Sequence, residues 1–243
     1  AAGQRRSTLN EDGKSEQHID VVNGDPSNPD RVTEIIAEGY QFKDKTTLSS
    51  ITESGVTSTW GGRSKMGNTT TGNNVTVEAD THTNAYGGWT TGEGTTATEK
   101  GSSTSNTITI NGTADVTGTV YGGYTDVAGG KALKNTVTIE KDLTSSIVAG
   151  HSTNGEASDN IVSLTDHTLT GDIIGGRGTV TNNNIIHIKN AAVTGTVTGG
   201  TAADGTGNTL KVCYGTKSSE IGDFQGIQNL HFDLENAPSD GTA

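Results

Sequence analysis

Five aromatic or basic residues recur at one position of this sequence, and their chemistry suits ligand binding. Each follows a Gly-Gly pair or, once, an Ala-Gly pair in the same place, and the five are Arg63, Trp89, Tyr124, His151 and Arg177. The series is extended by Thr201 and, in a weaker unit, by Tyr40. A row of aromatic rings and guanidinium groups is what a carbohydrate or protein partner binds. We predict the five as ligand-binding residues. The alternative is that they only cover a corner of the fold, lying over apolar edges.

The acidic and histidine residues do not form a recognisable catalytic or metal-binding pattern. Acid–base catalysis needs carboxylates that converge, but the candidates fall at different positions of the repeat: Asp115, Asp142, Asp166 and Asp172. Asp166-His167 and Gly150-His151 come nearest to a glycosidase-like cluster, and His151 lacks paired aspartates. No G-x-S-x-G or H-E-x-x-H motif is present. We therefore predict no catalytic residues, no metal site and no cofactor. The alternative is a polysaccharide lyase or glycosidase.

A repeat fixes the positions of these residues. The stretch from Asn184 to Gly200, NIIHIKNAAVTGTVTGG, matches NIVSLTDHTLTGDIIGG from Asn160 to Gly176. The same order of Asn, alternate apolar residues, a turn, and alternate apolar residues ending in Gly-Gly recurs along the chain, with anchors at Asn73, Asn106, Asn135, Asn160, Asn184 and Asn208. A repeat of this length is typical of stacked supersecondary units that cannot bury their apolar faces alone.

Apolar residues alternate with a period of two inside each unit, which indicates strands. Ile108 and Ile110, and Val137 and Ile139, are examples. We predict an all-β, single-stranded parallel β-helix, a right-handed solenoid of about seven to eight coils. The Gly-Gly pairs are predicted at corners, where glycine takes a positive φ without penalty. Two roles stay open for the repeating Asn, a stacked amide ladder inside a bend or a tolerant turn residue.

Charge and composition narrow the function classes. The net charge of −12 disfavours binding of nucleic acids and of anionic membranes. Only 29% of residues are hydrophobic and 4% aromatic, so stability must come from contacts between neighbouring coils. Cys213 is the one cysteine, so the chain forms no internal disulfide, and we expect a buried, inert thiol. No run of 18 apolar residues is long enough to span a membrane as a helix.

The chain divides into three segments. Residues 1–47 are predicted as a polar arm with an irregular cap or first coil, residues 48–234 as the β-helix repeats, and residues 235–243 as a tail or a cut linker. The interval between each Gly-Gly pair and the next Asn varies most, so insertions collect at one corner. The largest insertion spans residues 90–105.

The repeat units from Asn106 to Gly123, Asn160 to Gly176 and Asn184 to Gly200, followed by GIQNLHFDL, resemble the β-helical passenger regions of type V autotransporter adhesins from Gram-negative bacteria. The resemblance covers roughly residues 48 to 234. It implies Sec-dependent export, display on the cell surface, and attachment to the outer membrane through a C-terminal barrel that this chain does not include.

Taken together, residues and resemblance predict a non-catalytic, surface-displayed adhesin passenger fragment. Its partners would be a host or bacterial surface protein or glycan, with self-association possible in principle and nucleic acid excluded. An enzyme would instead bring at least two carboxylates within about 10 Å of each other in a groove. A third reading, an inert surface spacer, needs neither a carboxylate cluster nor an aromatic patch.

Overall fold

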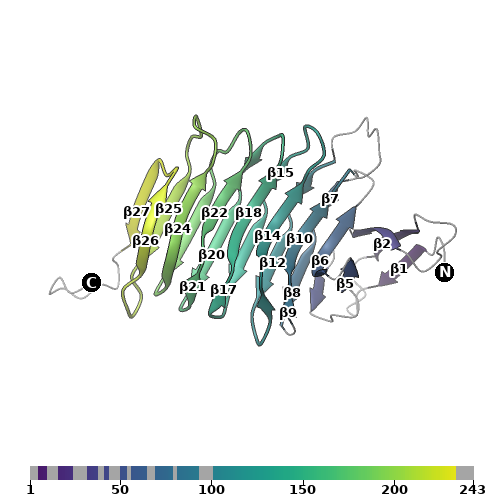
Figure 1. The fold of residues 1–243 in the computed structure, drawn as a ribbon, viewed down its shortest axis with the longest axis horizontal. Helices are drawn as coiled ribbons and strands as arrows, with labels where there is room; N and C mark the ends of the chain where they lie inside the picture. The colour runs from purple at the N-terminus through teal and green to yellow at the C-terminus, as the bar shows by residue number, and fades with distance from the viewer. Residues whose placement is uncertain are drawn as a thin grey trace.

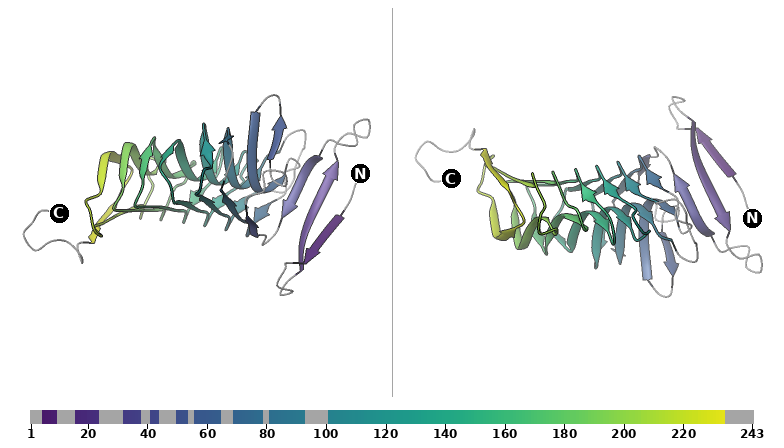
Figure 2. Two further views of the ribbon diagram at one scale, coloured as in Figure 1. Left: turned by 90° about the horizontal axis from the view of Figure 1, so that it is seen from below. Right: turned by 90° about the horizontal axis from the view of Figure 1, so that it is seen from above.

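The computed structural model describes residues 5–9, 16–23, 32–37, 41–43, 50–53, 56–64, 69–78, 81–92 and 101–233, with side chains from residue 58 onward. Over these residues the chain is all β, and its parallel strands stack into a solenoid of about six turns (Figure 1). The predicted all-β parallel solenoid is therefore confirmed. Figure 2 shows the coils stacked along the long axis, with the N-terminal strands at one end and the C-terminal coil at the other.

One eight-stranded sheet, which we call the Asn sheet, contains the six strands that follow the repeating Asn residues and one further strand at each end. Its strands are β4 (Gln41–Lys43), β8 (Asn74–Val77), β12 (Thr107–Ile110), β16 (Thr136–Ile139), β20 (Ile161–Thr165), β23 (Ile185–Lys189), β25 (Thr209–Cys213) and β27 (Asn229–Asp233). Neighbours pair in parallel, and equivalent residues of successive coils face each other, as Ile108 faces Val137 and Val137 faces Val162. The sequence repeat is thus a repeat in space.

A thirteen-stranded sheet, the Gly-Gly sheet, covers the opposite side of the coils. Its parallel strands are β6 (Val56–Ser64), β10 (Asn84–Thr90), β14 (Thr119–Thr125), β18 (Ser146–Ser152), β22 (Ile173–Arg177), β24 (Ala192–Gly200) and β26 (Glu220–Gln225), together with the short β17 (Leu143–Thr144) and β21 (Thr168–Thr170). Antiparallel strands join it at the N-terminal end, and these are β1 (Arg5–Leu9), β2 (Glu16–Asn23), β3 (Val32–Ala37) and β5 (Ser50–Glu53).

Two small sheets of two-residue strands complete the coils. One precedes the repeating Asn and contains β7 (Thr70–Thr71), β11 (Ser103–Thr104), β15 (Ala132–Leu133) and β19 (Ala157–Ser158). The other joins the Asn sheet to the Gly-Gly sheet and contains β9 (Thr81–His82) and β13 (Asp115–Val116). The inward-facing apolar residues of both large sheets form one continuous core along the solenoid.

The repeating Asn residues form a buried amide ladder, so the first of the two predicted roles is confirmed. Each Nδ2 donates to the Oδ1 of the next Asn over 2.8 to 3.1 Å, through the series Asn73, Asn106, Asn135, Asn160, Asn184 and Asn208. The same Oδ1 also accepts the backbone N–H of the preceding Asn. After the last Asn, Gln228 Oε1 accepts the backbone N–H of Asn208 at 3.0 Å.

The predicted role of the Gly-Gly pairs is wrong, because the pairs lie inside strands and not at corners. The residue with positive φ is instead the one before each ladder Asn, and these are Gly72, Ser105, Lys134, Asp159, Asn183 and Gly207. Glycine is needed in the pairs for space: a Cβ on Gly123 would overlap the side chain of Asn135, and one on Gly122 would overlap the carbonyl oxygen of Ala149 in the next coil. The ladder therefore depends on the pairs.

The prediction of seven to eight coils exceeds the six or so turns that are present. The difference lies toward the N-terminus, where β1, β2 and β3 pair antiparallel and so do not wind into coils. The predicted boundary between residues 47 and 48 falls outside the described residues, as do the tail at residues 235–243 and Tyr40.

Candidate functional site

The five predicted ligand-binding residues stand in one row on the Gly-Gly sheet. Trp89 pairs in register with Arg63 on one side and Tyr124 on the other, and His151 pairs with Tyr124 and Arg177. Adjacent strands lie about 4.8 Å apart, so side chains in register are close enough to touch. The fold thus brings together all five residues; that they bind a ligand stays a prediction.

A second row, which the sequence analysis missed, runs beside the first. It consists of the residue before each Gly-Gly pair, and Tyr86 pairs in register with Trp60 and Tyr121. The two rows make contact: the rings of Tyr86 and Trp89, which flank one pair, stack at 4.4 Å. We call the combined surface the aromatic strip, and it comprises Trp60, Arg63, Tyr86, Trp89, Tyr121, Tyr124, His151 and Arg177.

The N-terminal half of the aromatic strip is a continuous stack. The Arg63 guanidinium lies 4.0 Å from the centre of the Trp89 ring, within the range of a cation–π interaction. The next contacts are Trp89 with Tyr86 at 4.4 Å and Tyr86 with Tyr121 at 5.0 Å, each with rings 7° from parallel. Trp60 closes the end, with its ring 4.9 Å from the Arg63 guanidinium carbon.

The C-terminal half turns its rings by nearly a right angle. Tyr124 and His151 stack at 4.6 Å and 3°, while the Tyr121 ring meets Tyr124 at 79° and His151 at 81°. Offset-stacked and edge-to-face pairs are the favourable arrangements of aromatic rings. Because these contacts occupy many of the ring faces, we infer that the strip offers a partner ring edges and polar groups more than open faces.

Exposure increases along the strip. Trp60, Arg63 and Tyr86 are buried, whereas Trp89, Tyr121, Tyr124 and His151 are partly exposed and Arg177 is exposed. The accessible part of the strip therefore runs from Trp89 to Arg177.

Burial sets the protonation of the strip. It raises the pKa of Tyr86 and of Tyr124, with the Asp126 carboxylate adding to the effect on Tyr124. Burial, and then the nearby Arg177, lowers the pKa of His151 to about 4. His151 is therefore neutral at physiological pH. Neither row contains an acidic residue between Trp60 and Thr201, although the chain has 28 Asp and Glu residues. Arg63 and Arg177 are the two cationic side chains of the strip, and Arg63 is buried.

Three of the four carboxylates considered for catalysis contact a neighbouring coil, and Asp166 does so by accepting a hydrogen bond from Asn190 Nδ2 at 2.8 Å. Asp142 Oδ1 accepts the backbone N–H of Thr168 at 2.7 Å and lies 3.5 Å from His167 Nδ1. Asp172 Oδ1 accepts the N–H of Thr196 at 2.8 Å. In the part of the chain that the structure describes, no three His, Cys, Asp or Glu side chains gather as they would to hold a metal ion.

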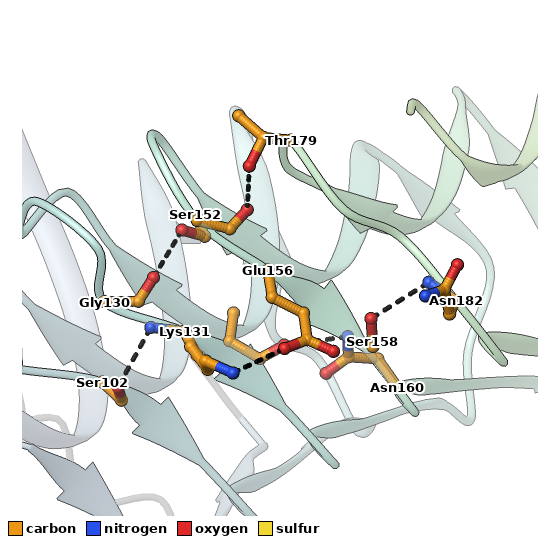
Figure 3. A network of polar contacts seen from close by, with 11 residues as sticks. Ser102, Gly130, Lys131, Ser152, Glu156, Ser158, Asn160, Thr179 and Asn182 are labelled. Carbon is orange, nitrogen blue, oxygen red and sulfur yellow. Dashed lines mark hydrogen bonds and ion pairs between the residues drawn. The ribbon is translucent and has the colours of Figure 1, made fainter. Parts of the chain in front are cut away.

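The corner where insertions collect is held by polar contacts between coils (Figure 3). Lys131 Nζ lies 2.7 Å from Glu156 Oε2, and this contact lowers the pKa of the Glu156 carboxyl. Ser152 Oγ donates to the Gly130 carbonyl at 2.7 Å, and Asn182 N–H donates to Ser158 Oγ at 3.0 Å. Side chains here bind one another and the neighbouring backbone, so this corner is organised for stacking.

Cys213 is buried, as expected, and its Sγ lies 3.0 Å from His187 Nε2. Burial, with the Asp233 carboxylate nearby, raises the pKa of the thiol. Burial also lowers the pKa of His187, so at neutral pH the pair is a neutral thiol beside a neutral imidazole. A thiolate nucleophile is disfavoured in this setting.

Comparison of the chain with protein families, curated proteins and solved structures finds no match. Among the described residues, no helix has the length and hydrophobicity needed to cross a membrane. The geometry of the aromatic strip is therefore the main guide to function.

Proposed function

We propose that this chain is a non-catalytic binding module, the passenger fragment of a surface-displayed adhesin, and that the aromatic strip is its ligand-binding surface. The parallel β-solenoid is consistent with the resemblance to autotransporter passengers. The proposal includes export to the cell surface or outer membrane of a Gram-negative bacterium. It also includes a ligand on a host cell, on a neighbouring cell or on another copy of the chain.

The observation that carries the proposal is the concentration of aromatic residues on one outer face. Both tryptophans and three of the five tyrosines of a chain with 4% aromatic residues lie in the strip. The fold does not require them there, because Val148 and Ile174 occupy the same register position in the next two coils. Aromatic and Arg side chains are the types enriched where proteins bind partners.

The chemistry of the strip fits a partner rich in oxygen acceptors, such as a glycan or a polar protein surface. Arg177 donates from a planar group of five N–H bonds, and ring edges carry the positive part of the aromatic quadrupole. Individual contacts of this kind are weak. Many copies displayed side by side would convert weak contacts into strong attachment through avidity.

A glycan-array and cell-binding screen tests the proposal. The strip variant combines Tyr124→Ala, His151→Ala and Arg177→Ala, which remove three of its five accessible side chains. The matched control combines Thr109→Ala, Thr138→Ala and Ser163→Ala, three partly exposed positions in register on the Asn sheet.

We expect binding by the unchanged chain and the control, and loss of binding by the strip variant, with all three proteins folded by circular dichroism. Equal binding by the strip variant and the control would refute the assignment of the site. Absence of binding by every folded protein would favour an inert spacer, and release of reducing ends from a polysaccharide would favour the enzyme alternative.

A further inference from the structure

In the part of the chain that the structure describes, large apolar side chains are exposed at the C-terminal coil. Phe224, Leu230 and Phe232 are 48%, 42% and 63% exposed. Each continues a row that is apolar in the preceding coil, because Phe224 lies in register with Val197, Leu230 with Leu210 and Phe232 with Val212. Leu210 and Val197 are fully buried at those positions. The three residues thus continue the rows of the core but are largely exposed at the end of the described coils.

The same coil presents two open strand edges. Among the described strands, β27 pairs only with β25, and β26 pairs only with β24. An unpaired edge is a template for pairing with another chain, since its outward N–H and C=O groups lack strand partners. The apolar rows and the open edges therefore meet on one surface, which we call the end face.

We propose that the end face binds the end face of a second copy of this chain, through antiparallel pairing of β27 with β27 about a two-fold axis. The sequence of β27 is complementary to itself in this arrangement. With His231 opposite the partner's His231, Leu230 faces the partner's Phe232, so the core residues of the two chains cover each other. Asn229 faces the partner's Asp233, an amide opposite a carboxylate.

Strand β26 allows the same self-pairing. When the two-fold axis passes between Gly222 and Asp223 of β26, Ile221 faces the partner's Phe224. Glu220 then faces the partner's Gln225, and Asp223 faces the partner's Gly222, so no two acidic side chains oppose each other. An isologous contact requires a surface complementary to itself, and both strands of the end face meet that condition.

The net charge of the protein predicts how dimerisation through the end face depends on salt. Two chains of net charge −12 repel each other at long range, while the end face itself is apolar. Salt screens the repulsion and strengthens the burial of apolar surface when the anion is sulfate. Dimerisation should therefore become tighter as salt is added, whereas binding driven by opposite charges becomes weaker.

Analytical ultracentrifugation of the full chain over a range of concentrations tests the proposal. We expect a monomer–dimer equilibrium, and a dissociation constant at least tenfold higher for the variant with Leu230→Lys and Phe232→Lys. The control is Val180→Lys, an equally exposed apolar residue (42%) on another part of the surface. It should dimerise almost as the unchanged chain does.

A cross-linking experiment tests the register. In a Cys213→Ser background, His231→Cys places two thiols opposite each other across the two-fold axis. Opposed residues of antiparallel strands have Cα atoms about 4.5 to 5.5 Å apart, which a disulfide can bridge. Mild oxidation should give a covalent dimer. Lys211 lies in register with His231 in the preceding coil. The Lys211→Cys variant should therefore form no covalent dimer on gels run without reducing agent.

Three results would overturn the proposal. These are a monomer at every concentration, assemblies larger than a dimer that grow with concentration, or a dimer in which His231→Cys does not cross-link. Circular dichroism of each variant separates loss of pairing from loss of folding.

Discussion

Replacing Asn160 by Ala should destabilise the solenoid by about 4 kcal/mol. The Asn160 side chain is fully buried and takes part in four hydrogen bonds. Its Oδ1 accepts from the backbone N–H and Nδ2 of Asn135 at 3.0 and 3.1 Å, and its Nδ2 donates to the carbonyl of Ala132 at 3.1 Å and to Oδ1 of Asn184 at 3.0 Å. At about 1 kcal/mol net for each bond, four losses give the stated magnitude.

Urea unfolding followed by circular dichroism measures this loss. The control is Asn154→Ala, the same change in an exposed loop, which should stay within about 0.5 kcal/mol of the unchanged chain. Because repeat arrays can unfold in parts, amide hydrogen exchange adds a local reading: the Ile161 N–H, which donates to the Asn135 carbonyl, should exchange faster in the Asn160 variant. Equal midpoints for the two variants would refute a stabilising role of the ladder.

Three further predictions concern glycine packing, pH and the thiol. Gly123→Ala should cost about 3 kcal/mol in urea unfolding, because its Cβ would overlap the amide of Asn135; a fully stable variant would contradict the spacing argument. Since the pKa of His151 falls from 6.5 to about 4 on folding, the unfolded chain takes up the proton first, and stability should decline as the pH drops from about 6.5 to about 4. His151→Phe should remove that part of the decline, and an unchanged pH profile would count against it. Cys213 should react with a disulfide reagent far more slowly in the folded chain than in urea, because burial raises the pKa of its thiol; equal rates would mean that the thiol is accessible.

The fold was predictable from the sequence because a solenoid repeats each environment once per coil. A position that is buried in one coil is buried in the next, so Ile108, Val137 and Val162 share a type and a place in the repeat. The corner before each ladder Asn was not predictable. Residues as different as Ser105 and Lys134 adopt positive φ there, so the constraint lies in the backbone and leaves no common residue type.

One of the two rows of the candidate site was predictable from the sequence. The row after the Gly-Gly pairs was visible because the pairs mark its position. The row before the pairs was missed because residues three apart, such as Tyr86 and Trp89, should lie on opposite faces of a regular strand. Their rings stack instead. The sequence did contain a signal for the second row. It is the four-residue pattern of an aromatic residue on each side of the glycines, in YGGW and YGGY.

The ladder and the aromatic strip depend on the same glycines. Gly123 has no Cβ, so the side chain of Asn135 fits against it from inside, and the same glycine pair lies between Tyr121 and Tyr124, whose rings meet outside at 5.3 Å. A substitution in the ladder should therefore shift the rings of the strip, although it replaces no strip residue. If a ladder variant such as Asn135→Ala lost ligand binding, the cause would be a shift of the rings and not the loss of a contact between Asn135 and the ligand. Contact with the ligand can be assigned only from variants of exposed strip residues, Arg177 first, because its side chain can be removed with the Asn–Gly packing left intact.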